Sequence, residues 1–249
     1  MIDIATLKKV ARTKGITNLG FAEKDYFQDI LLLAISREAP HLVFKGGTAL
    51  YKFHGLDRFS EDLDFTGKAS PQDVRRLAGY IEDFGYPVEA ESKGVAGGTL
   101  ASFAVKAFLY QGTTASMARI RMDLSWKDED APAAEWRTHF PMYSDVPSFR
   151  VQVMTIEEMF AEKVRALLVR SKARDAYDVW FMLRKGVALE RKTLERKLSL
   201  YNSKLDLKTL DEALDAATGR WKAEVGPMLA NLPDYGAVSS ELRSWLTPR

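Results

Sequence analysis

The sequence predicts an α+β protein, with a sheet and flanking helices in the first part of the chain and a helical lobe after it. Short apolar runs at 42–44 and 63–65 and two longer β-rich runs within 99–126 lie in the first half. In the last third of the chain, apolar residues recur mostly at spacings of three and four. We therefore expect a core with N-terminal helices at 1–148 and a helical lobe at 149–249.

Composition limits the class of protein. The chain has 249 residues, of which 46% are hydrophobic and 28% charged. No apolar run reaches the roughly 18 residues that a bilayer-spanning helix needs, and the N-terminus lacks the apolar core of a signal peptide. The absence of cysteine excludes disulfides, thiolate nucleophiles and cysteine-ligated zinc. We therefore expect a soluble, cytoplasmic protein without membrane partners.

The elements before the first glycine turn are two helices and a strand. Residues 4–13 form a short amphipathic pattern, and apolar residues recur at helical spacing through 22–37. The apolar run at 42–44 predicts a buried strand. We expect a helix at 48–54 and a second short strand at 63–65.

The next elements are a capped helix and an antiparallel pair. Ser70 and Pro71 form a typical helix start, a serine cap followed by proline in the first turn. The β-rich runs at 99–112 and 115–126 are separated by a glycine-containing turn, which predicts a hairpin-like pairing. The proline-containing segment 128–148 reads as irregular and as the boundary between the lobes.

The C-terminal part predicts helices. Thr155 and Glu158 form a capping box before a long helix. A second helix follows a break at 171–173 and ends at Gly186, and the pattern remains helical to Pro227.

A glycine turn follows the first strand. Gly46, Gly47 and Thr48 precede a predicted helix, so backbone N–H groups and the positive end of the helix dipole face one point where an anion can bind. A plain turn would explain the two glycines equally simply. The segment is neither a P-loop nor a dinucleotide-binding fingerprint.

Three aspartates follow on two strands. Asp62 and Asp64 alternate with Leu63 and Phe65, so the two carboxylates share one strand face. Adjacent like charges repel, and a hard divalent cation such as Mg²⁺ gives a direct reason to keep them together. Asp123 lies on the polar face of a later strand and can join them. The alternatives are a solvated edge strand and a solvent-facing Asp123.

These residues resemble the nucleotidyltransferase superfamily related to DNA polymerase β. Gly47-Thr48, thirteen intervening residues, Asp62-Leu-Asp64 and the later Asp123 carry the resemblance. It implies a mixed sheet with flanking helices. It also implies that the three carboxylates hold Mg²⁺ or Mn²⁺ for a displacement at the α-phosphate of an NTP. The family usually has serine where this chain has Thr48, which keeps the hydroxyl.

The motifs Phe44–Leu50 and Arg58–Phe65 resemble the AbiEii family of nucleotidyltransferase-like toxins from toxin–antitoxin and phage-abortive systems. This resemblance spans most of residues 40–185. It implies tRNA, through its 3′ end, as acceptor and a cognate antitoxin as partner. It also places Ser60 beside the metal site, and we include Lys45 with the glycine turn among the nucleotide-binding residues.

The helical segment carries a further group of charged residues. Lys163 lies on the inward stripe of the first helix with Phe160 and Leu167, and an inward cation needs an anionic partner or must reach solvent along its own stem. Asp175 and Asp178 share a face near a helix start, where capping alone would explain them. The segment is similar to later AbiEii motifs, which implies that these residues line the nucleotide cleft: Lys163, Arg170, Lys172, Arg174, Asp175 and Asp178.

The first hypothesis for function is an enzyme that moves a nucleoside monophosphate from an NTP to an acceptor. Asp62, Asp64 and Asp123 would bind the metal, and Asp123 would help to deprotonate the acceptor. Lys163 would neutralise charge on the leaving pyrophosphate. Residues 163–197 contain eleven Lys or Arg against four Asp or Glu, and this segment either receives the acceptor or is a solvated helix surface.

Two other hypotheses remain open. A small-molecule nucleotidyltransferase of the aminoglycoside-modifying kind would need an acidic pocket, which the basic C-terminal lobe disfavours. A non-catalytic nucleotide-binding module acting through protein contacts is disfavoured because all three acids are present.

Overall fold

The computed structural model describes residues 1–126 and 132–246. The chain divides into two compact units, one of Met1–Phe53 with Phe59–Met154 and one of His54–Arg58 with Thr155–Arg249. The division thus differs from the expected boundary at 148. The strand that ends at Met154 hydrogen-bonds into the sheet, so the chain leaves the first unit only after it.

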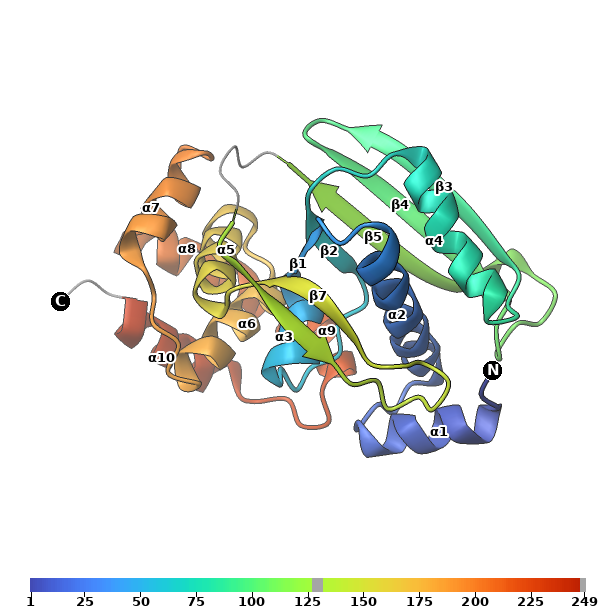
Figure 1. Ribbon diagram of the computed structural model, residues 1–249. Helices are drawn as coiled ribbons and strands as arrows, with labels where there is room; N and C mark the ends of the chain where they lie inside the picture. The colour runs from blue at the N-terminus through green and yellow to red at the C-terminus, as the bar shows by residue number, and fades with distance from the viewer. Residues whose placement is uncertain (127–131, 247–249) are drawn as a thin grey trace. The chain divides into compact units, whose positions relative to one another are not determined.

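The first unit is built on a mixed sheet (Figure 1). Within the described residues seven strands hydrogen-bond in the order β3-β4-β5-β2-β1-β7-β6. The pairs β2/β5 and β1/β7 are parallel, and the other neighbours are antiparallel. The strands are β1 (Val43–Lys45), β2 (Leu63–Thr66), β3 (Val88–Val95), β4 (Gly98–Val105), β5 (Ala118–Ser125), β6 (Ala134–His139) and β7 (Phe149–Met154). The predicted α+β class and mixed sheet are confirmed.

Helices cover one face of this sheet. Helix α2 packs against β5 and β7, and α4 packs against β3 and against α2. The side chains of β5 alternate between buried and exposed, so its second face carries the more exposed residues. The helices of this unit are α1 (Ile4–Thr13), α2 (Leu19–Glu38), α3 (Gly46–His54), α4 (Pro71–Asp83) and the 3₁₀ turn η1 (Thr114–Ser116).

Side chains cap both helix starts that the sequence predicts. Ser70 accepts from the backbone N–H of Asp73, and the Asp73 carboxylate accepts in return from the backbone of Ser70. Thr155 accepts from the N–H of Glu158. The reciprocal pair at Ser70 and the single bond at Thr155 satisfy N–H groups that have no partner within the helix. The return bond of the expected capping box at Thr155 is not among the contacts of Glu158, whose carboxylate lies beside Lys197.

Three strands differ from the prediction. β3 is mostly polar and exposed, and it forms because each of its residues pairs with β4. β6 lies within the segment 128–148 that the sequence marks as irregular, of which 128–131 lie outside the described residues, and β7 follows directly after that segment. β6 is an exposed edge strand, so little apolar alternation marks it. These strands form because they pair with a neighbouring strand, and local sequence does not reveal that pairing.

The second unit is helical in the described residues. Its helices are α5 (Ile156–Arg170), α6 (Ala173–Arg184), α7 (Arg191–Ser199), α8 (Leu207–Thr218), α9 (Trp221–Glu224), the 3₁₀ turn η2 (Gly226–Met228) and α10 (Tyr235–Leu246). The predicted break between α5 and α6 falls at Ser171, which adopts a left-handed conformation with φ of 51°. Helix α10 lies beyond the predicted limit at Pro227.

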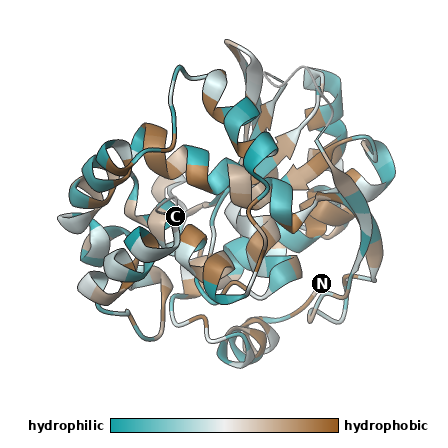
Figure 2. Cartoon of the chain, turned by 90° about the vertical axis from the view of Figure 1, so that its left-hand side faces the viewer, coloured by the Kyte–Doolittle hydropathy of each residue, from teal (hydrophilic) through white to brown (hydrophobic). Residues whose placement is uncertain are grey.

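Hydrophilic and hydrophobic residues interleave along the helices (Figure 2). None of the helices in the described ranges combines the length and the apolar character needed to cross a bilayer.

Candidate active site

A row of charged residues crosses the middle of the sheet. Lys45 on β1 pairs in register with Asp64 on β2, and Asp64 pairs with Asp123 on β5. Residues in register point to the same side of a sheet, and neighbouring strands lie about 4.8 Å apart. The flanking residues of β2 and β5 are buried, whereas Asp64 is half-buried and Asp123 exposed. The predicted common face of Asp64 and Asp123 is confirmed.

Asp62 precedes β2 by one residue. Its side chain is partly exposed, and Arg121 Nε lies 3.9 Å from Asp62 Oδ1. Two contacts fix the backbone here. The Thr48 hydroxyl donates to the carbonyl oxygen of Asp62, and the Gln28 amide donates to the carbonyl oxygen of Ser60 at 2.8 Å. The path of the chain into β2 is therefore set by contacts with α3 and α2.

Gly46 allows the glycine turn to meet the acidic strand. Its φ is +77°, a conformation that side chains with a Cβ rarely adopt. A Cβ at this position would lie 2.8 Å from the Cγ and 2.9 Å from the Cβ of Asp64, and nearer still to Oδ2. Glycine is therefore required here both by the backbone and by the close approach of the Asp64 carboxylate.

The glycine turn starts α3. Gly46, Gly47 and Thr48 occupy its first turn, where backbone N–H groups have no acceptor within the helix. The Thr48 side chain is fully buried, and its hydroxyl donates to the carbonyl oxygen of Asp62. The backbone N–H groups remain as the anion-binding feature of the turn.

The three acids do not form a ready-made metal cage. Within the described ranges, no three His, Cys, Asp or Glu side chains form a group that could hold a metal ion. The in-register pair Asp64 and Asp123 nevertheless suits Mg²⁺, which commonly binds one or two carboxylates together with substrate phosphates. The donor chemistry therefore fits a metal that arrives with a nucleotide.

The second unit contains a buried charged cluster centred on Lys163. Its Nζ lies 2.7 Å from Asp178 Oδ2 and 3.4 Å from Asp175 Oδ1. Arg58 binds Asp178 through two hydrogen bonds, Nε to Oδ1 and Nη2 to Oδ2, each 2.7 Å long. Arg170 binds Asp175 in the same two-bond manner at 2.7 and 2.8 Å. Three cations thus surround two carboxylates.

The charged states of this cluster follow from its contacts. Burial alone would raise the pKa of Asp175, but Lys163 and Arg170 outweigh burial and lower it to about 2. Burial would also raise the pKa of Asp178, but Arg58 and Lys163 outweigh burial and lower it. Both carboxylates are therefore ionised at neutral pH.

The two acids of this cluster are buried and paired. Asp178 is 0% exposed and Asp175 1%, and cations occupy the oxygens of both. Their contacts hold Lys163, whose side chain is 11% exposed. Lys172 is the N-cap of α6 and Arg174 lies in its first turn, and both are partly exposed.

The basic segment 163–197 is partly neutralised within the second unit. Lys197 is buried, and its Nζ lies 2.7 Å from Glu158 and 3.3 Å from Glu162. Arg196 also approaches Glu158, at 3.4 Å. These cations serve the packing of α5 against α7, so the segment is less basic at its surface than its composition suggests.

The sequence alone does not reveal that Arg58 is a partner of this cluster. Arg58 was visible only as part of a motif, because its partner Asp178 lies 120 residues away. A second contact of the same kind joins Tyr177 to Asp57 at 2.6 Å. These bonds explain why the short segment His54–Arg58 belongs to the helical unit.

Comparison with known proteins identifies relatives of this chain. A family model described as nucleotidyl transferase AbiEii toxin, Type IV TA system, matches residues 30–247. Among curated proteins, none matches the sequence.

Solved structures share the fold. MenT4, a nucleotidyltransferase toxin from Mycobacterium tuberculosis, superposes with a TM-score of 0.68 at 19% identity, covering 96% of this chain and 87% of its own. JHP933 from Helicobacter pylori superposes with a TM-score of 0.58 at 20% identity, covering 91% of this chain and 90% of its own. At such identities the likeness shows a common fold and no more.

Proposed function

The chain belongs to the AbiEii family of nucleotidyl transferase toxins, and from this premise we propose that it transfers a nucleoside monophosphate from an NTP to an acceptor hydroxyl. The observation that carries the proposal is the register of Asp64 and Asp123 on adjacent parallel strands, beside the glycine turn that starts α3. In the reaction the acceptor oxygen bonds to the α-phosphorus, the bond to the β-phosphate breaks, and pyrophosphate leaves.

The carboxylates of the first unit provide the metal ligands in this proposal. Asp64 and Asp123 would hold Mg²⁺ or Mn²⁺ together with the phosphates. Asp62 lies directly before β2, the strand that carries Asp64. When bound, the metal stabilises negative charge on the attacking and leaving oxygens. Asp123 is the most exposed of the three acids, which suits it to accept the proton of the acceptor hydroxyl.

Backbone and cationic groups hold the triphosphate. The N–H groups of Gly47 and Thr48 at the start of α3 bind phosphate oxygens, because the helix dipole favours anions there. Lys163 is oriented by Asp175 and Asp178, and the family resemblance assigns it to neutralise charge on the departing pyrophosphate.

The acceptor we propose is the 3′ end of tRNA. Adding a nucleotide there blocks aminoacylation and so stops translation, which accounts for toxicity. A cognate antitoxin then restrains the activity, and both reactants place the protein in the cytoplasm. The match to a nucleotidyl transferase toxin of a Type IV toxin–antitoxin system supports the transfer reaction and the antitoxin partner, and tRNA as acceptor rests on the family resemblance of the sequence motifs.

A labelling experiment tests the proposal. Purified protein is incubated with Mg²⁺, total tRNA and each labelled NTP in turn, and the products are separated on a denaturing gel. We expect label on tRNA from the wild type, none after chelation, and none from Asp62→Ala. Asp83→Asn, which changes an exposed acid at the end of α4, should label as the wild type does.

The alternatives give different products. Equal labelling by Asp62→Ala would remove the catalytic assignment. Label on a small amine would indicate a small-molecule transferase, and nucleotide binding without any product would indicate a non-catalytic module.

A further inference from the structure

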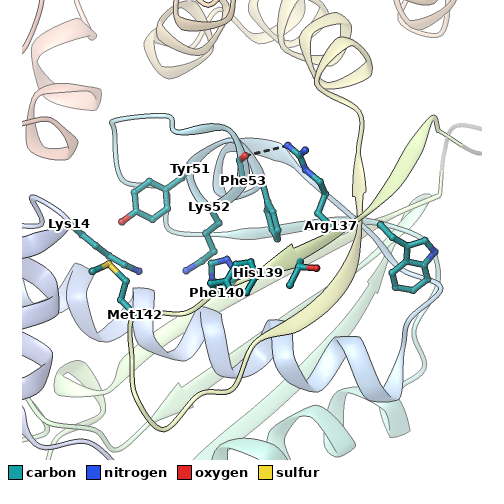
Figure 3. Close-up of a pocket in the computed structure, with 10 residues that line it drawn as sticks. Lys14, Tyr51, Lys52, Phe53, Arg137, His139, Phe140 and Met142 are labelled. Atoms are coloured by element: carbon teal, nitrogen blue, oxygen red, sulfur yellow. Dashed lines mark hydrogen bonds between the residues drawn. The ribbon is translucent and has the colours of Figure 1, made fainter.

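A cavity lies in the first unit between α3 and β6 (Figure 3). Its volume is about 680 Å³, within the range of roughly 300–1,000 Å³ that small-ligand sites occupy. None of the aspartates assigned to the metal lines it. The lining residues are Lys14, Tyr51, Lys52, Phe53, Trp136, Arg137, Thr138, His139, Phe140 and Met142.

The floor of the cavity is a fixed ionic network. Lys52 is 1% exposed, and its Nζ lies 2.9 Å from Asp25 and 2.6 Å from Asp29. His139 Nε2 lies 2.9 Å from the same Asp29 oxygen, and Lys14 Nζ lies 2.6 Å from Asp25. Burial would lower the pKa of Lys52, but the two aspartates outweigh burial and raise it. Lys52 therefore stays charged and in place.

The rim combines aromatic and basic side chains. Trp136 is 48% exposed and Phe140 74%, although burial of such large apolar surfaces is the norm. The Arg150 guanidinium lies 5.8 Å from the centroid of the Trp136 ring. Arg137 donates to the carbonyl oxygen of Phe53 at 3.4 Å, which holds β6 against the end of α3.

The charge of the lining has one sign. Lys14, Lys52 and Arg137 are cationic, and no lining residue is a carboxylate. Asp25 and Asp29 behind the floor offset the two lysines. At the rim, Arg137 Nε lies 3.5 Å from the carboxylate of Glu135 in a solvent-exposed pair, and Arg150 lies over the Trp136 ring.

Flat aromatic surface beside arginine is the chemistry that holds unpaired bases and their phosphates. β6 is an edge strand of the described sheet, so no further strand pairs with its outer side. We propose that this cavity binds an unpaired nucleotide of single-stranded nucleic acid, with its base on Trp136 or Phe140 and its phosphate at Arg137.

The site goes beyond the proposed function, since it would bind a strand whether or not transfer occurs. Its assignment to the acceptor strand rests on the proposed function. Binding and transfer are therefore measured separately, so that failure of one is distinguishable from failure of the other.

Fluorescence anisotropy with a labelled eight-nucleotide single-stranded RNA of mixed sequence tests the proposal. Loss of a stacked base raises Kd by about fivefold or more, so Trp136→Ala should show at least this effect. Arg137→Gln should raise Kd and reduce the slope of log affinity against log salt by about 0.7, the loss of one phosphate contact on a single strand. Thermal melting confirms that both variants fold.

Matched controls use residues away from the cavity. Trp245→Ala removes an exposed tryptophan from α10 of the second unit, and Arg75→Gln removes an exposed arginine from α4. Both should leave Kd within about twofold. Asp62→Ala should bind the strand normally while failing to transfer.

Two further arms complete the test. A blunt, fully paired RNA hairpin should bind more weakly than the single strand, and a single-stranded DNA of the same sequence shows whether the 2′-hydroxyl contributes. Equal Kd values for wild type, Trp136→Ala and Arg137→Gln would overturn the proposal and favour a protein partner for the exposed aromatic residues.

Discussion

Two pairs of aspartates show opposite ways of holding a carboxylate. Asp64 and Asp123 stand in register on a sheet face of the first unit and remain partly or largely exposed. Asp175 and Asp178 in the second unit are buried, and an arginine binds both oxygens of each. Exposed carboxylates can accept a metal and a substrate, whereas buried and fully paired ones fix the position of their partners.

The comparison separates two roles that the sequence motifs leave together. All four aspartates lie in segments that resemble the same family, yet only the sheet pair is accessible. We infer that the sheet acids act on the reactants and that the helical acids position Lys163. Substitutions in and around each pair distinguish these two roles.

The largest effect is expected from Asp178→Ala. This variant leaves Arg58 and Lys163 close together without the carboxylate that they share. Removing one partner of a buried pair costs about 3–5 kcal/mol, and urea unfolding should show a loss of this size. Asp83→Ala, at an exposed position, should change stability by less than about 0.5 kcal/mol. A similarly small change for Asp178→Ala would contradict the positioning role.

Gly46→Ala tests how the sheet acids are held. A left-handed conformation costs a residue with a Cβ about 1–2 kcal/mol, and the new Cβ would also displace the Asp64 carboxylate. Both stability and transfer should fall. The matched control is Gly79→Ala in the middle of α4, where a Cβ meets nothing within 4 Å, and it should stabilise by about 0.5–1 kcal/mol. Wild-type transfer by Gly46→Ala would show that the close approach is unimportant.

Acid titration tests the pairing of Asp175. Its pKa is lowered from 3.8 to about 2 in the folded state, so the pairing stabilises the fold above the unfolded pKa and is lost as pH falls. The expected loss is about 1 kcal/mol by roughly pH 3 and about 2 kcal/mol below the folded pKa. Unfolding free energies of wild type and Asp175→Asn, compared from pH 6 to pH 2.5, should converge as pH falls. Parallel curves would rule out this contribution.

Thr48→Val should have the smallest effect on stability. The substitution keeps the shape but removes the donor to the Asp62 carbonyl, at a cost of about 1–2 kcal/mol. If the hydroxyl positions Asp62, kcat should fall with little change in KM for the NTP, and Thr48→Ser should restore it. A raised KM with unchanged kcat would instead indicate direct phosphate binding.

The sequence predicts those features that local patterns encode. Alternation in β2 and β5 places Asp64 and Asp123 on one face, and the side chain of Thr155 caps the start of α5. These features follow from periodicity and from side chains three residues apart.

Other features depend on partners far away in the chain. The Arg58–Asp178 pair joins residues 120 positions apart, and no spacing rule could indicate it. The buried acids Asp25 and Asp29 look unusual within an apolar helix, but Lys52 and His139 explain them only once the chain has folded. The hydrogen bond from the Thr48 hydroxyl to the Asp62 carbonyl oxygen also becomes visible only in the structure.

Binding of Mn²⁺, followed by electron paramagnetic resonance in the presence of a non-hydrolysable NTP analogue, tests the central claim most directly. Wild type and Asp83→Asn should bind the ion equally, and Asp64→Asn and Asp123→Asn should each weaken binding by about tenfold or more, because each removes an ionised oxygen ligand. Equal Mn²⁺ affinity in all four proteins would contradict the assignment of these sheet acids as the metal ligands.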